Sequence, residues 1–135
     1  MWYKNVCVYS CFAHFESIQG NLKYYTKAAE LGDVDAHFNI SCSYRDGEGV
    51  ENDDEKRMYH LEEAAIGGHP YARYSLGWIE EKNGRIERAV KHLIIAANLG
   101  CDDALDAVTK RFERGLVSKE YYDTAHCGHQ AAVDA

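Results

Sequence analysis

The chain has 135 residues, a formal net charge of −7 and a single proline. This length allows one domain or one short helical array with a modest core. The negative charge argues against general nucleic-acid binding, which needs clustered Lys and Arg side chains. No apolar run approaches the roughly 18 residues that a membrane span requires.

The N-terminal segment, residues 1–19, differs from the rest of the chain. Its apolar residues recur at helical spacing, so we expect either a capping helix or a disordered tail. Its mixed apolar run is short for a signal-peptide core and contains Cys7 and Cys11, which favours a cytoplasmic location. The five cysteines are odd in number and irregularly spaced, so we expect free thiols and no disulfide framework.

Helical patterns follow one another from Gly20 to the end of the chain. Apolar spacing predicts helices over residues 22–31, 34–44, 54–66, 70–82, 85–99 and 102–114, and a last helix after Ser118. Asp33 and Ser118 are predicted N-caps, and Asn52 with Glu55 resembles a capping box.

Related sequence segments recur three times, over residues 27–36, 63–72 and 95–104. Each contains two adjacent alanines, a glycine suited to a left-handed helix end, and a further alanine. The glycines Gly32, Gly68 and Gly100 are 36 and then 32 residues apart. A period of this length with two helices per unit is typical of a stacked helical array. The predicted units are a half unit over 20–32 and full units over 33–68, 69–100 and 101–133.

The first full unit resembles the Sel1-like repeat, a relative of the tetratricopeptide repeat with a longer loop between its helices. The matching residues are Ala36, Ile40, Ser41, Tyr44, Gly47, Gly49, Val50, Asp53, Lys56, Tyr59, Ala64, Ala65 and Gly68. The second unit keeps Ala72, Leu76, Gly77, Ala89, Ala96, Ala97 and Gly100 without the Gly-x-Gly-Val loop, and the unit from Ala104 is degenerate. The resemblance implies an all-α, right-handed α-solenoid of antiparallel helix pairs over residues 20–135.

The same resemblance implies a non-enzymatic scaffold that binds a protein or peptide on the concave face of the array. By register, the implied partner-binding residues are Phe38, Asn39, Arg45, Tyr71, Tyr74, Trp78 and Glu81. The three aromatic residues of the second unit share one helical stripe, and aromatic side chains are over-represented at binding hot spots. Alternatively, these rings pack beneath the flanking helices.

Two other functions stay open. The chain is also consistent with a self-assembly module, or with a fragment of a larger Sel1-repeat adaptor, because its terminal units are not obviously polar caps. Some relatives of this repeat family resemble β-lactamases, but the Ser-x-x-Lys signature of such hydrolases is absent. We therefore expect no catalytic residue and no cofactor.

Candidate metal ligands do not form a convincing set in the sequence. The loop over residues 46–55 lacks the alternating oxygen ligands of a calcium loop. His126 with His129, and Cys7 and Cys11 with His14, are also incomplete sets of ligands. His60 and His92 occupy equivalent positions in successive units, which predicts one shared structural role. The sequence thus predicts no metal site.

Overall fold

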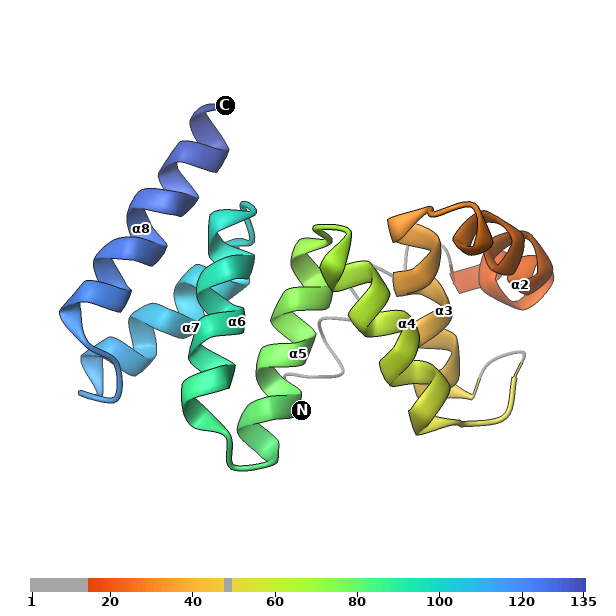
Figure 1. Ribbon diagram of the computed structural model, residues 1–135, viewed down its shortest axis with the longest axis horizontal. Coiled ribbons are helices and arrows are strands. Elements are labelled where there is room, and N and C mark those ends of the chain that lie inside the picture. Colours follow the sequence, from red (N-terminus) through yellow and green to blue (C-terminus); the bar gives the residue numbers. More distant parts are fainter. Residues whose placement is uncertain (1–14, 48–49) are drawn as a thin grey trace. The chain divides into compact units, whose positions relative to one another are not determined.

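The computed structural model describes residues 15–47 and 50–135, with side chains from residue 22 onward. All regular structure in these residues is helical (Figure 1). The helices are α2 (Phe15–Glu30), α3 (Val34–Asp46), α4 (Asp54–Ile66), α5 (Pro70–Lys82), α6 (Ile86–Asn98), α7 (Asp102–Glu113) and α8 (Lys119–Asp134). Helix α2 begins before Gly20, so it crosses the boundary predicted at residues 19 and 20. Cys7, Cys11 and His14 lie outside the described residues.

The described residues form two compact units, one ending at His69 and the other spanning Pro70–Ala135. In the first unit, α3 packs against α2 and α4; in the second, α6 packs against α5, α7 and α8. Each unit buries its own apolar side chains, such as Ile40 in the first and Leu93 in the second. The predicted all-α fold of helix pairs is confirmed, whereas the right-handed sense of the array stays a prediction.

Side-chain caps define where several helices begin. Asp33 accepts a hydrogen bond from the backbone N–H of Ala36 at 3.0 Å, and Ser118 caps α8 in the same way, so both predicted N-caps are confirmed. The predicted capping box is wrong. Asp53 is the N-cap of α4, because its side chain accepts from the Lys56 N–H at 3.1 Å.

Asn52 stabilises the end of α3 instead of the start of α4. Its side-chain amide donates to the carbonyl of Arg45 at 3.1 Å. Gly47 ends α3 with φ of 71°, and a Cβ atom at this position would lie 2.2 Å from the side-chain oxygen of Asn52. The left-handed backbone favours glycine here, and a larger residue would also displace the Asn52 side chain.

The three repeat glycines close their helices in one shared geometry. Gly32, Gly68 and Gly100 have φ values of 91°, 90° and 92°. In each case the glycine N–H and the next N–H bond back to the carbonyls of the paired alanines; the Gly68 bond to Ala65 measures 3.1 Å. This is the Schellman arrangement, which satisfies carbonyl groups that a helix end would otherwise leave unpaired. The recurring Ala-Ala and Gly residues therefore end successive helix pairs in the same way.

Membrane insertion through a helix is not supported by the part of the chain that the structure describes. None of its helices combines the length and the apolar character that crossing a bilayer demands.

Candidate partner-binding site

The predicted partner-binding residues of the first unit differ in how much surface they expose. Phe38 and Asn39 on α3 are only 1% and 7% exposed. The ring of Phe38 stacks on His69, with 4.2 Å between ring centroids. Arg45 is half-buried near the end of α3, where its guanidinium pairs with the carboxylate of Asp46 at 2.8 Å. The Arg45 side chain is itself only 10% exposed, little more than Asn39.

Helix α5 carries the predicted residues of the second unit. Pro70 begins this helix, where its missing N–H leaves no hydrogen bond unmade. Tyr74 is fully buried, and its ring meets the Trp78 ring edge-on at 6.1 Å. Tyr71, Trp78 and Glu81 are half-buried. Tyr74 therefore belongs to the packed interior, as do Phe38 and Asn39, and the function proposed below does not use these three as contacts.

A residue that the sequence analysis did not single out, Arg111, completes this part of the second unit. Its guanidinium forms an ion pair with Glu81 and donates to the carbonyl of Ala107 at 2.8 Å. The same group lies 5.0 Å from the centroid of the Trp78 ring. Arg111 is buried, so the indole and the carboxylate are held in place from α7. The sequence offered no signal for it, because Arg111 lies in the degenerate unit, 30 residues from Glu81.

Burial also controls the chemistry of the neighbouring phenol. It raises the pKa of Tyr74 to about 12, an effect reinforced by Asp103 and Cys101 and opposed by the nearby Trp78 and Arg111 side chains. The phenol is consequently neutral at physiological pH and has no role as a base there. Burial likewise raises the pKa of the Cys101 thiol to about 11. Neither group is poised for nucleophilic chemistry.

In two helix pairs, a histidine of the second helix contacts the first helix at a related position. His60 on α4 meets His37 on α3, with their Nδ1 atoms 2.9 Å apart. His92 on α6 meets Arg73 on α5, with 3.4 Å between Nη1 and Nδ1. Burial and the neighbouring His37 lower the pKa of His60, and Glu63 opposes this shift. Burial is also the main cause that lowers the pKa of His92, and the charge of Arg73 lowers it further. The sequence thus placed His60 and His92 at equivalent positions, but it did not show that their contact partners differ.

The histidines of α8 do not act together. His126 meets the hydroxyl of Thr109 at 3.1 Å, whereas His129 meets the carboxylate of Asp102 at 2.6 Å. In the described residues no group of three or more His, Cys, Asp or Glu side chains is arranged to hold a metal ion. The two imidazoles of α8 therefore have separate local partners.

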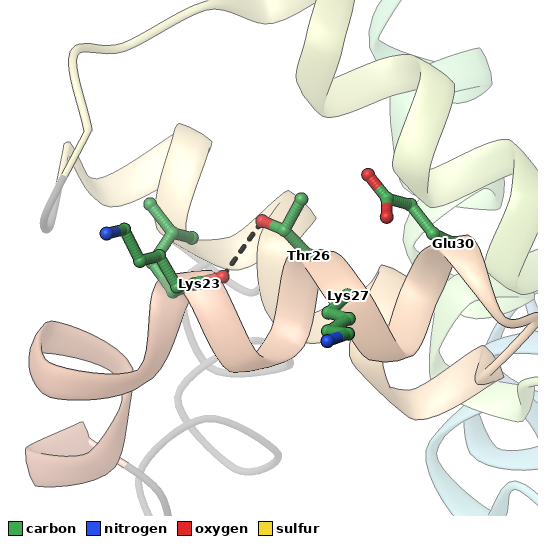
Figure 2. A pocket seen from close by; sticks show the side chains of 5 residues that line it. Lys23, Thr26, Lys27 and Glu30 are labelled. Atoms are coloured by element: carbon green, nitrogen blue, oxygen red, sulfur yellow. Dashed lines mark hydrogen bonds between the residues drawn. The ribbon is translucent and has the colours of Figure 1, made fainter.

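A shallow hollow lies along α2 (Figure 2). It is lined by Leu22, Lys23, Thr26, Lys27 and Glu30, all from this one helix. The hydroxyl of Thr26 donates to the carbonyl of Leu22 at 2.8 Å, so it is satisfied by its own helix. The lysines and the glutamate are exposed, which is the ordinary state of a solvated helix face.

Comparison with known proteins identifies the repeat. The sequence matches the Sel1 repeat over residues 22–33, 34–69 and 70–101, which together make up more than half of the chain. The matched segments begin at residues 22, 34 and 70, and the predicted units begin at 20, 33 and 69. The predicted unit over 101–133 lies beyond them; in the structure this region contains α7 and α8.

The chain is also similar to a curated protein that is named as a regulatory factor. Over 87 residues the chain is 28% identical to chitin synthase regulatory factor 4 of Schizosaccharomyces pombe. The aligned part is 64% of this chain but only 14% of that protein. The chain therefore spans about one seventh of the length of this relative.

The helical pairs, their shared glycine ends and the three matched segments lead to one assignment. Sel1 repeats generally mediate protein–protein interactions. The chain belongs to the Sel1-repeat family.

Proposed function

We propose that this chain is a non-catalytic adaptor that binds another protein or peptide through the first helices of its repeats. The three consecutive Sel1 repeats support this function, because the family generally mediates protein–protein interactions. The regulatory name of the fission-yeast relative is in keeping with an adaptor role.

In the second unit, the proposed contact surface consists of Tyr71, Trp78 and Glu81 on α5. All three side chains are half-buried, and Tyr71 and Trp78 are of the aromatic types that are enriched at binding hot spots. Arg111 holds Trp78 and Glu81 from α7, so little side-chain entropy would be lost on binding. Such preorganisation is the observation that favours this surface over the exposed charged faces of the other helices.

In the first unit, Arg45 is the proposed contact. Its guanidinium is already paired with Asp46, so a partner would meet an ion pair of low net charge. We therefore expect Arg45 to contribute orientation more than affinity.

Site-specific photo-crosslinking in cells would test the proposal. Tyr71 is replaced by p-benzoyl-phenylalanine, and the matched control carries the same residue at Tyr121, a half-buried tyrosine of α8 in the same unit. The expected result is a crosslinked partner from position 71 and none from position 121. Equal crosslinking from both positions would reject the proposed surface.

Two charge-reversal variants test whether the α5 surface itself makes the contact with the partner. Glu81→Lys reverses the charge that Arg111 holds, and Glu87→Lys makes the same change at an exposed position of α6. If the proposal is right, Glu81→Lys abolishes the crosslink from position 71 and Glu87→Lys leaves it intact. A crosslink only to another copy of this chain would instead favour self-assembly.

A further inference from the structure

The first unit contains a pair of imidazoles in direct contact. His37 of α3 and His60 of α4 place their Nδ1 atoms 2.9 Å apart, with ring centroids separated by 5.1 Å. Both side chains are half-buried, so the pair lies within reach of solvent. At this separation the two nitrogen atoms can share only one proton, with one donating and the other accepting.

The same separation suits two ligands of one metal ion. Imidazole nitrogen binds such ions at about 2.0–2.1 Å, so two nitrogens at a right angle around the metal lie about 2.9 Å apart. A tetrahedral angle would place them about 3.3 Å apart. Right-angle geometry with nitrogen ligands is typical of Ni(II) and Cu(II). Metal binding would require each ring to turn its lone pair away from the other nitrogen and toward the ion.

Aromatic neighbours restrict the movement of both rings. Tyr59 meets the His37 ring edge-on at 6.3 Å and the His60 ring at 5.1 Å. Tyr44 stacks on His60 at 6.1 Å, and the Lys56 ammonium lies 5.8 Å from the Tyr44 ring centroid. The two ligands are therefore already close together in the folded unit, but turning both lone pairs toward one ion has to overcome this packing.

The neighbouring repeat has no such pair. Its equivalent contact joins His92 to the guanidinium of Arg73, which has no lone pair to offer a metal. The second unit thus repeats the position of the histidine without repeating the potential ligand set, and His92 becomes a natural control.

We propose that His37 and His60 form a two-imidazole binding site for a divalent transition-metal ion, with Ni(II) and Cu(II) as the chemical class. No third His, Cys, Asp or Glu among the described residues joins them in a larger group. Water or a ligand from a partner protein fills the other coordination positions. The site is therefore open and exchangeable, unlike a closed structural zinc site.

Titration of the untagged full-length chain with Ni(II) alone, in a non-chelating buffer and under reducing conditions, would test the site. Calorimetry should show one saturable site in the wild type. His37→Gln or His60→Gln should weaken it by at least about tenfold, because either change removes one of the two ligands. His92→Gln should bind as the wild type does. Unchanged binding in His37→Gln and His60→Gln, or no saturable binding in the wild type, would overturn the proposal.

A measurement on the wild type alone keeps the test valid if a variant fails to fold. In imidazole nitrogen–proton NMR spectra, substoichiometric Ni(II) should broaden the signals of His37 and His60 before those of any other histidine. Broadening that begins at His126 or His129 would place the metal on α8 and contradict the proposed site.

Discussion

Glu80 is a buried carboxylate that connects the end of α5 to the start of α6. Only 6% of the residue is exposed, and its side chain accepts hydrogen bonds from Arg85 at 2.5 and 3.1 Å. Arg88 lies 3.4 Å from the same carboxylate. The hydrogen bond from Arg85 lowers the pKa of Glu80, outweighing the opposite effect of burial, and the charges of Arg85 and Arg88 lower it further. The folded state therefore favours the ionised form.

This lowered pKa predicts an acid-dependent loss of stability. The ordinary pKa of the group is 4.5, and its value in the folded protein is lower. Its contribution is present above pH 4.5 and is lost as the pH falls through the folded-state pKa, because the unfolded chain binds the proton first. In urea titrations from pH 7 to pH 3, Glu80→Gln should show a smaller fall in unfolding free energy than the wild type.

Glu87→Gln provides the comparison for that experiment. Glu87 is exposed and pairs with Lys91 on the surface of α6, so this change should leave the pH dependence close to that of the wild type. Parallel curves for the wild type and Glu80→Gln would show that the buried carboxylate has no special effect on acid stability.

At the scale of the helix, Gly77 lies where α5 packs tightly against α6. A Cβ atom at Gly77 would lie 3.0 Å from Cδ2 of Leu93 and 3.2 Å from the carbonyl oxygen of Ala89. Leu93 is fully buried, and Ala89 contributes a backbone atom that its helix holds in place. The Leu76-Gly77 pair of the repeat pattern thus has a packing explanation: the glycine leaves space for the facing helix.

Gly77→Val should destabilise the second unit by about 1–3 kcal/mol through overpacking. Helix propensity alone predicts the opposite sign, because valine is a better helix former than glycine by a few tenths of a kcal/mol. Urea unfolding followed by circular dichroism at 222 nm would measure the change. An increase in stability would mean that Leu93 moves aside and that the approach of the helices is not limiting.

Helix bounds and turn residues were largely predictable from the sequence, whereas side-chain exposure was not. Asp33, Ser118 and the repeat glycines act as predicted because capping and left-handed φ depend on a few neighbouring residues. The capping box at Asn52 failed because an adjacent residue, Asp53, competes for the same N–H groups. Only the path of the loop decides which of two adjacent capping residues reaches the free N–H groups of the helix.

At the scale of the whole molecule, negative charge is concentrated in one unit. Residues 1–69 contain 12 acidic and 6 basic residues, a net charge of −6, whereas residues 70–135 contain 10 and 9, a net charge of −1. Each described unit also buries its own core. Like charges repel copies of a protein, so the chain gains little electrostatic benefit from self-association.

Sedimentation velocity would test the remaining alternative of self-assembly. We expect the monomer mass of 15.3 kDa to persist across protein concentrations at moderate ionic strength, because the net charge of −7 opposes close approach. An apparent mass that rises with concentration would support a structural or assembly function and count against a monomeric adaptor. Repeating the experiment at high salt would show how far charge repulsion prevents association.

The sequence by itself determined the all-α fold, the repeat period and the family, because apolar spacing, capping and glycine turns are local properties of the chain. Only the tertiary structure decided which side chains meet. Tyr74 and Trp78 share one helical stripe, yet Tyr74 is fully buried while Trp78 keeps some exposure. Arg111 reaches Glu81 across 30 residues, and His37 reaches His60 across 23. Such contacts depend on how helices pack within each unit, which the spacing of residues along one helix does not specify.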